Sequence, residues 1–336
     1  MKKTTEVTVI GAGMWGSTLA GLLADKGHSV RAWEYNHAIA AHLAKNRTHS
    51  ALPGFKLPAG VKIFTELEKA VQAPDLVLMA VDSRHVRGLA RAIKPLLKGK
   101  LPHIIAVTKG IEAGKFMTVC EIIEEEIPQA RNLTMIMTGP SFAVEVAAGA
   151  PTKVVLAGRD LKELKKAAKL IEGGPLKLEL SEDRLGAELG GSLKNVYAVG
   201  SGIIDGLSKA SKNSEAAFLI ESASELRRII KALGGKNRTA WGLSGMGDLL
   251  LTATSAKSRN FRFGREIGHG VPAAEAQRRI KTVVEGFEAL KTARGLCARH
   301  GIKTPVIDCI WRIVYKDHKP SSILQAAGFS TSKQRG

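Results

Sequence analysis

The sequence is poor in cysteine and in aromatic residues. Its 336 residues include three cysteines, Cys120, Cys297 and Cys309, and aromatic residues make up only 5% of the chain. Three scattered cysteines are too few for a disulfide framework or a zinc site, and this usage fits a reducing compartment. We therefore expect no metal site and a cytoplasmic location.

Long apolar runs are also missing. The basic start, Met1-Lys2-Lys3, passes into a short strand without the apolar core of a signal peptide. Nowhere does the chain hold a run near the ~20 apolar residues that a membrane span needs. We therefore expect no integral membrane segment.

Acidic residues are scarce: 31 stand against 50 basic ones, for a formal net charge of +19. Such a charge can attract nucleic acid, a membrane surface or small acidic ligands. The basic residues are dispersed, and few aromatic residues accompany them to form a stacking platform. We expect no nucleic-acid partner and interpret the charge as solvated basic faces that also attract phosphorylated substrates. A basic nucleic-acid binder stays as an alternative.

The chain divides into two parts of different pattern. Up to about residue 182, short apolar runs alternate with helical stretches, which predicts a parallel sheet with crossover helices. Expected strands cover residues 7–10, 29–33, 75–81, 103–108, 133–137 and 153–156, and expected helices cover 14–25, 84–97 and 161–171. Later helical patterns cover residues 183–207, 214–233, 273–280, 286–300 and 305–315. We predict an α/β fold, with an N-terminal Rossmann-like doubly wound sheet (residues 1–185) and an all-α C-terminal domain (186–336).

A glycine-rich turn follows the first expected strand and begins the first expected helix. Its pattern, Gly11-x-Gly13-x-x-Gly16, is typical of dinucleotide-binding proteins in this context. Gly11 permits the tight turn, Gly13 lets the backbone approach a pyrophosphate, and Gly16 lets helix and strand pack closely. We expect these glycines, with Met14 and Trp15 between them, to bind a nicotinamide dinucleotide.

Glu34 ends the next strand, 18 residues after Gly16. A carboxylate here accepts hydrogen bonds from the ribose hydroxyls and repels a 2′-phosphate. Tyr35 follows it, and no arginine comes at once. The cofactor is therefore predicted to be NAD, with NADP as the alternative.

A lysine lies within the glycine-studded helix of the second part. The segment Gly190-Gly191-Ser192-Leu193-Lys194-Asn195 shares that helix with Gly186, Gly200 and Gly202. Glycine costs ~1 kcal/mol against alanine inside a helix, so these residues indicate close approach of other backbone or of a ligand. Desolvation among apolar neighbours lowers the pKa of an ammonium group and suits it to proton transfer near neutral pH.

From about residue 8 to residue 323 the chain resembles one family, the bacterial-type NAD(P)-dependent sn-glycerol-3-phosphate dehydrogenases. The stretches that carry the resemblance are residues 11–17, Thr108-Lys109-Gly110-Ile111-Glu112, Gly139-Pro140-Ser141-Phe142-Ala143, residues 190–196, Gly245-Met246-Gly247-Asp248-Leu249, Ser258-Arg259-Asn260 with Phe263-Gly264, and Val283-Val284-Glu285-Gly286. Each stretch is short, but their order and spacing together are specific.

The resemblance implies a reaction and its residues. The family interconverts sn-glycerol 3-phosphate and dihydroxyacetone phosphate by hydride transfer, largely for glycerophospholipid synthesis. Lys194 matches the family's general acid/base, Asp248 the carboxylate that orients it, and Lys109 a second cation that binds and polarises the substrate and meets the cofactor. Members are commonly homodimers.

Further positions match the family's binding groups. Asn195 and Thr252 match polar groups of the substrate pocket, and Gly139 and Ser141 match substrate contacts. Ser258, Arg259 and Asn260 match the phosphate-binding segment, predicted at the start of a helix through Phe263. Matches to cofactor contacts are Ala143, Arg259, Val283 and Glu285.

The sequence departs from the family pattern at two places. Relatives usually carry Thr-Arg-Gly where this chain has Ile220-Glu221-Ser222, so a basic position at a candidate subunit contact has become acidic. Many relatives also have a basic residue or histidine where this chain has Glu34-Tyr35, which again favours NAD.

Two other protein classes are alternatives. Dehydrogenases of the 3-hydroxyacid or ketopantoate-reductase type place an asparagine four residues after the lysine, where this chain has Ala198. A catalytically silent NAD(H)-binding protein would use the fold without the chemistry. The joint presence of Lys194, Asp248, Lys109 and Arg259 argues against such a protein.

Overall fold

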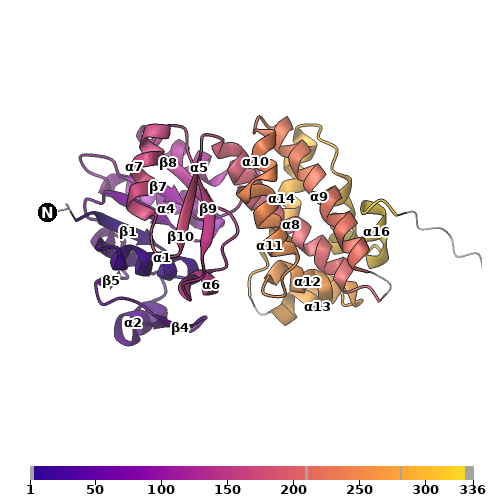
Figure 1. Ribbon diagram of the computed structural model, residues 1–336, viewed down its shortest axis with the longest axis horizontal. Coiled ribbons are helices and arrows are strands. Elements are labelled where there is room, and N and C mark those ends of the chain that lie inside the picture. The colour runs from indigo at the N-terminus through magenta and orange to yellow at the C-terminus, as the bar shows by residue number, and fades with distance from the viewer. Residues whose placement is uncertain (1–3, 209–210, 281, 330–336) are drawn as a thin grey trace, which may run out of the picture. The chain divides into compact units, whose positions relative to one another are not determined.

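The computed structural model describes residues 4–208, 211–280 and 282–329. These residues fall into two compact units, one within residues 1–109 and 117–184 and the other within residues 110–116 and 185–336 (Figure 1). Residues 110–116, which the sequence places in the first domain, belong to the second unit, where Ile111 and Phe116 pack against the helical core. The division into folding domains at 185/186 stays a prediction.

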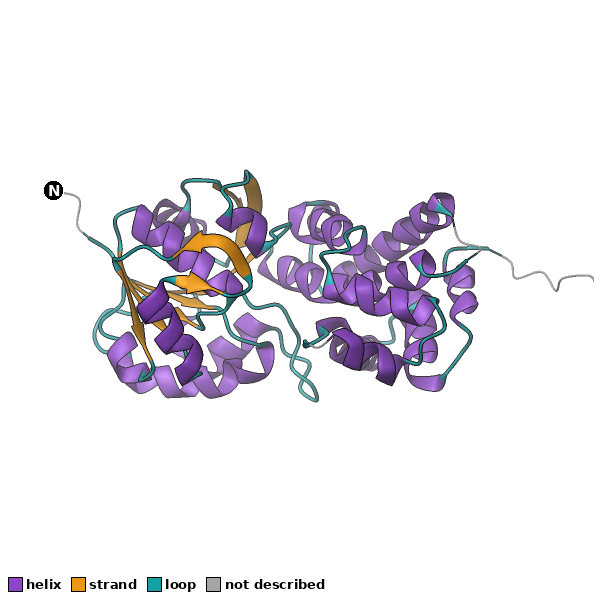
Figure 2. Cartoon of the chain, turned by 90° about the horizontal axis from the view of Figure 1, so that it is seen from below, coloured by secondary structure: helices purple, strands orange, loops and turns teal. Residues whose placement is uncertain are grey.

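The first unit is built on a sheet of eight strands in the order β10-β9-β8-β7-β6-β1-β2-β5. Helices cover the sheet, and its central strands are buried along their length, as two covered faces require (Figure 2). This arrangement confirms the predicted α/β class. The strands are β1 (Glu6–Ile10), β2 (Ser29–Trp33), β5 (Val61–Phe64), β6 (Leu76–Met79), β7 (His103–Ala106), β8 (Thr134–Thr138), β9 (Thr152–Ala157) and β10 (Leu176–Ser181).

The sheet is parallel, as predicted, except at one pair of strands. β9 runs antiparallel to β8, with Ile136 opposite Ala157, while the other pairs of this sheet are parallel. Only the short helix α6 (Ala143–Ala147) lies between β8 and β9. A parallel neighbour usually needs a longer helical crossover.

Four strands were missed from the sequence. β5 and β10 lie at the two edges of the sheet and carry polar residues such as Lys62 and Lys177, so they lack the continuous apolar run of a central strand. A separate hairpin of β3 (Thr48–His49) and β4 (Leu52–Lys56) was also missed. Short, half-exposed strands leave a weak periodic signal.

Helices of the first unit follow their local signals. α1 (Met14–Asp25) and α7 (Leu161–Ile171) have the predicted bounds, and the Asp160 side chain caps α7 by accepting hydrogen bonds from two backbone N–H groups. The predicted helix 84–97 is instead α4 (Val86–Ile93) between two 3₁₀ turns, since Pro95 cannot continue an α-helix. The remaining helices are α2 (His37–Asn46), α3 (Leu67–Ala70) and α5 (Val119–Glu126).

The second unit is built from helices, which confirms the predicted class. Its core includes the fully buried rings of Tyr197, Phe218 and Phe263. No helix among the described residues is both long and apolar enough to cross a membrane. The helices are α8 (Arg184–Asp205), α9 (Lys212–Ala232), α10 (Asn237–Trp241), α11 (Asp248–Ala253), α12 (Arg259–Gly268), α13 (Ala273–Ile280), α14 (Glu285–Arg299), α15 (Pro305–Lys316) and α16 (Ile323–Ala326).

Glycines let α8 and α12 pack at backbone distance. Gly202 of α8 faces the backbone of Phe261 and Arg265 in α12, and Gly206, directly after α8, faces Gly268. A Cβ atom on Gly202 would overlap the carbonyl oxygen of Phe261. The many glycines of α8 therefore serve close helix packing, as their cost inside a helix predicted.

Candidate active site

The glycine-rich turn connects β1 to α1 in the first unit. Gly11 has φ +98°, and a Cβ there would lie 2.6 Å from the carbonyl oxygen of Ala80, so this position needs glycine. A Cβ on Gly16 would overlap the carbonyl oxygen of Gly11. A Cβ on Gly13 would meet nothing within 4 Å, so packing within the chain does not explain that glycine.

The N-terminus of α1 is open to an anion. Gly13 occupies the cap position without a capping side chain, and the first turn holds no acidic residue. The first N–H groups of a helix lack partners within it and favour negative charge. The segment therefore suits the pyrophosphate of a dinucleotide, with Met14 exposed and Trp15 half-buried beside it.

Glu34 turns its carboxylate onto the glycine-rich turn. It is only 4% exposed, and its two oxygens accept hydrogen bonds from the backbone N–H groups of Ala12 (3.1 Å) and Asn36 (3.0 Å). Its charge also reaches His49, where it opposes the burial that lowers the pKa of that imidazole. Glu34 thus braces the turn, a role that the sequence did not predict, while Tyr35 is 71% exposed.

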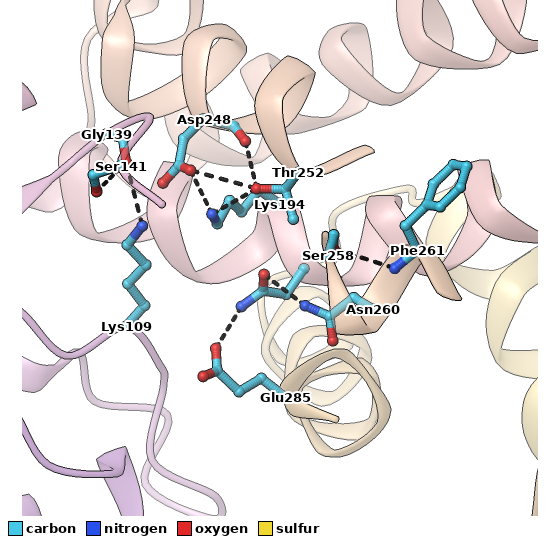
Figure 3. A network of polar contacts seen from close by, with 11 residues as sticks. Lys109, Gly139, Ser141, Lys194, Asp248, Thr252, Ser258, Asn260, Phe261 and Glu285 are labelled. Atoms are coloured by element: carbon cyan, nitrogen blue, oxygen red, sulfur yellow. Dashed lines mark hydrogen bonds and ion pairs between the residues drawn. The ribbon is translucent and has the colours of Figure 1, made fainter. Parts of the chain in front are cut away.

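Three predicted substrate residues meet at the carboxyl ends of β7 and β8. Lys109 Nζ lies 3.5 Å from the carbonyl oxygen of Gly139, and the Ser141 hydroxyl donates to the same oxygen at 3.1 Å (Figure 3). Gly139 has φ +142°, and a Cβ there would press on Val154. Ligands of doubly wound folds bind outside this edge of the sheet. Ala143 begins α6 just beyond.

In the second unit, Lys194 of α8 is buried with Asp248 and Thr252 of α11. Lys194 is 7% exposed and Asp248 is 0% exposed. The ammonium forms an ion pair with the Asp248 carboxylate and donates to the Thr252 hydroxyl at 2.7 Å (Figure 3). That hydroxyl in turn donates to the Asp248 carbonyl oxygen at 2.7 Å. The ammonium is thereby held in one position.

A glycine contact and a π-helical turn set the position of Asp248. The segment Leu243–Gly247 is π-helical and leads directly into α11 at Asp248. A Cβ on Gly190 would overlap the carbonyl oxygen of Ser244, so only glycine lets α8 approach this turn. Single π turns are frequent at functional sites. The sequence indicated a close approach at Gly190 but not the π turn.

A chain of amides and a carboxylate continues from Lys194 along α8. Asn195 Nδ2 donates to Glu285 at 2.8 Å, and Asn260 Nδ2 donates to Asn195 Oδ1 at 2.8 Å (Figure 3). The Asn260 carbonyl oxygen accepts from the backbone N–H of Gly286 at 2.9 Å. Both amide orientations are therefore fixed by partners, a network that no single motif of the sequence predicts.

The predicted phosphate segment begins α12. Ser258 caps the helix by accepting a hydrogen bond from the Phe261 N–H at 3.2 Å, so its hydroxyl has a structural task that the motif did not predict. Arg259 Nη2 lies 3.7 Å from the Glu285 carboxylate, and the Arg259 side chain is 37% exposed. Val283 is 48% exposed. Arg259 is thus the accessible cation of this segment.

The predicted site residues form two groups by unit. The first unit holds the glycine-rich turn, Glu34, Lys109, Gly139, Ser141 and Ala143, and the second holds Lys194, Asn195, Asp248, Thr252, Ser258, Arg259, Asn260, Val283 and Glu285. Within residues 4–208, 211–280 and 282–329, no three His, Cys, Asp or Glu side chains are grouped so as to hold a metal ion.

Comparisons with known proteins agree on one family. The model described as NAD-dependent glycerol-3-phosphate dehydrogenase N-terminus matches residues 6–164, and the corresponding C-terminus model matches residues 183–325. The glycerol-3-phosphate dehydrogenase [NAD(P)+] of Agathobacter rectalis is 37% identical over 94% of this chain and 93% of its own length. That of Anaeromyxobacter dehalogenans is 36% identical over 95% of this chain and 96% of its own length.

A solved structure supports the same grouping. The crystal structure of glycerol-3-phosphate dehydrogenase from Coxiella burnetii is 32% identical and superposes with a TM-score of 0.88, covering 96% of this chain and 98% of that one. A D-mandelate dehydrogenase, at 18% identity and a TM-score of 0.59, shares the fold alone.

Proposed function

The chain belongs to the NAD-dependent glycerol-3-phosphate dehydrogenase family, and we propose that it transfers hydride between a nicotinamide cofactor and the pair dihydroxyacetone phosphate and sn-glycerol 3-phosphate. The observation that carries the chemistry is the buried Lys194 held by Asp248 and Thr252. The ion pair and the hydrogen bond hold Nζ in one orientation, which proton transfer to a substrate oxygen requires.

The cofactor is NAD(P), which supplies or accepts the hydride when bound. The uncapped N-terminus of α1 and the space beside Gly13 suit its pyrophosphate. The buried Glu34 carboxylate favours NAD over NADP because a 2′-phosphate would meet a fixed negative charge. Further contacts are assigned to Met14, Trp15, Tyr35, Lys109, Ala143, Arg259, Val283 and Glu285.

Lys194 acts as the general acid in ketone reduction. Its ammonium donates a proton to the substrate oxygen as hydride reaches the carbon, which neutralises the developing alkoxide. In the reverse direction the neutral amine takes that proton back. Asp248 and Thr252 orient Nζ. Lys109 is assigned a separate role as a cation that binds and polarises substrate.

Substrate recognition is assigned to one exposed cation, Arg259, and to buried polar groups. Arg259 pairs with the phosphate through its guanidinium, which forms two parallel hydrogen bonds to phosphate oxygens. Asn195 and Asn260, fixed by their mutual hydrogen bond, contact the substrate through their amides, and Ser258 presents the start of α12. Gly139 and Ser141 are assigned to the substrate as well.

We further propose a metabolic role, a location and an assembly for the protein. Reduction yields a phosphorylated glycerol, the backbone that glycerophospholipid synthesis consumes. Three free cysteines fit a cytoplasmic enzyme. We propose small-molecule substrates as its ligands, a homodimer as its assembly, and no nucleic-acid partner.

Steady-state turnover tests the proposal. Purified protein should oxidise NADH in the presence of dihydroxyacetone phosphate, and more slowly in the presence of unphosphorylated dihydroxyacetone. Lys194→Met should abolish turnover while NADH binding persists, whereas Lys316→Met, on the unrelated helix α15, should leave the rate unchanged. NADH binding by the wild type without turnover would instead support a silent nucleotide-binding protein.

A further inference from the structure

The second unit contains a cavity that shares no lining residue with the candidate active site. Its volume is about 680 Å³. One face of α15 forms a wall, because Pro305, Asp308, Cys309 and Arg312 recur at spacings of three and four residues. Arg228 of α9 and Ala326 of α16 also line the cavity, and both helices are labelled in Figure 1.

The lining is strongly basic. Arg228, Lys303, Arg312 and His318 all border the cavity, and among the described residues that line it Asp308 is the single carboxylate. Asp308 already accepts a hydrogen bond from Arg294 at 2.8 Å. The one acidic group of the lining is therefore engaged by a cation outside it, and of the four basic groups Arg228 has a carboxylate neighbour, Glu225.

The basic side chains differ in how they are held. Arg228 donates from Nε to the Lys303 carbonyl oxygen at 3.0 Å and lies 3.6 Å from Glu225, so its position is fixed. Across the part of the chain that the structure describes, no hydrogen bond or ion pair engages the side chains of Lys303, Arg312 and His318. These three groups have donors available to a ligand.

A solvated basic face is the simplest alternative, given the net charge of +19. Lys303, Arg312 and His318 are exposed and can be solvated where they stand. Here they gather in one concavity that also has an apolar wall of Pro305, Cys309 and Ala326. A cleft lined by one sign of charge concentrates field and raises the local concentration of ligands of the opposite sign.

We propose that this cavity binds a soluble phosphorylated small molecule. Lys303 and Arg312 hold the phosphate, His318 adds a further donor, and the apolar wall contacts the carbon part of the ligand. A guanidinium matches phosphate oxygens with parallel hydrogen bonds. The volume lies within the ~300–1,000 Å³ range of small-molecule pockets. This site does not rest on the proposed dehydrogenase function.

Calorimetric titration of the full chain with inorganic pyrophosphate tests the proposal. Arg312→Glu and, separately, Lys303→Glu should each weaken one class of pyrophosphate sites by at least about tenfold, the size expected for a lost charge-assisted contact. Arg278→Glu is the matched control, because it makes the same charge change on α13, outside the cavity. It should bind pyrophosphate like the wild type.

Activity separates this site from the dehydrogenase site. The KM for dihydroxyacetone phosphate should be the same in all three variants. Equal pyrophosphate binding by Arg312→Glu, Lys303→Glu and Arg278→Glu would overturn the proposal. A rise in KM that parallels the loss of pyrophosphate binding would also overturn it, because the cavity would then belong to the substrate path.

A lipid headgroup offers the same phosphate chemistry, and a sedimentation experiment distinguishes it. Phosphatidylcholine vesicles with and without phosphatidic acid should pellet the wild type and Arg312→Glu equally little. Pelleting by phosphatidic acid that Arg312→Glu abolishes would identify a membrane surface as the ligand and refute the soluble one.

Discussion

The buried ion pair between Lys194 and Asp248 makes a quantitative prediction about stability. Both side chains are removed from water, at 7% and 0% exposure. Removing one partner of such a pair leaves an uncompensated buried charge and costs about 3–5 kcal/mol. Asp248→Asn and Lys194→Met should therefore each destabilise the second unit by roughly that amount.

The double variant should cost far less than the sum of the single ones. When Lys194→Met and Asp248→Asn are combined, neither position carries a charge, and the remaining cost of about 1–2 kcal/mol comes from the poorly satisfied amide. The coupling free energy between the two positions should thus be at least ~3 kcal/mol, the lower end of the cost of an unpaired buried charge. Thr252→Val, which removes one acceptor of the ammonium, should cost less than either charge deletion.

Urea unfolding of the wild type, the two single variants and the double variant measures this coupling free energy. Trp241 and Trp311 lie in the second unit, so replacing Trp15 and Trp33 by phenylalanine in every variant confines the fluorescence signal to that unit. Single-variant effects that add within ~0.5 kcal/mol would refute the reasoning, because additivity is the behaviour of independent sites. The ammonium and the carboxylate would then not depend on each other.

Four further predictions follow from other contacts. Glu34→Gln should lower the ratio of kcat/KM for NADH to that for NADPH. Glu34→Ala also removes the acceptor of the Ala12 N–H and should weaken the binding of both cofactors. An unchanged ratio in both variants would show that Glu34 does not select the cofactor. Arg259→Ala should raise the KM for dihydroxyacetone phosphate by about tenfold or more but hardly change it for dihydroxyacetone, and equal changes would contradict phosphate recognition. Gly264→Ala should destabilise the second unit by at least ~2 kcal/mol in urea, because its Cβ would overlap the Val199 carbonyl oxygen. Gly242→Ala is the control and should cost little, because φ there is -82° and the Cβ would meet its neighbours only at 3.5 Å or more. Burial raises the pKa of the Glu225 carboxyl from 4.5 to about 7, so the folded state binds the proton more tightly than the unfolded state does. The contribution of this group to stability is therefore lost as pH rises from about 4.5 through 7. Glu225→Gln should remove up to ~3 kcal/mol of that pH dependence, and parallel plots of unfolding free energy against pH for wild type and variant would contradict it.

Strong periodic or capping signals decided which parts of the fold could be predicted. α1 begins after a glycine-rich turn, and α7 begins after Asp160, a good N-cap residue, so both bounds were readable from the sequence. β10 alternates lysine and glutamate with leucine at an exposed edge, and its strand character depends on pairing with β9. Such a segment has little local preference until its neighbour is in place.

The site residues were readable by motif, but their contacts were not. Glu34 was expected at the ribose, yet its hydrogen bond to the Ala12 N–H joins residues 22 positions apart and depends on β1 and β2 being neighbours. Ser258 was expected to contact phosphate, and the structure shows that it caps α12. A motif identifies a residue type at a position. The hydrogen-bond partner of that residue often lies in a segment distant in the sequence, and only the folded structure shows which one.

The glycines of α8 disfavour the helix locally but permit its close contacts with distant segments. Inside α8 each glycine opposes the helix, and a sequence can show only that something must compensate this cost. The structure identifies the compensation as backbone: Gly190 admits the π turn before Asp248, and Gly202 admits α12, which carries Asn260. The same residues that weaken α8 as a helix thus place the carboxylate and the amide beside Lys194 and Asn195. A helix without those glycines would be more stable alone and could not assemble this site.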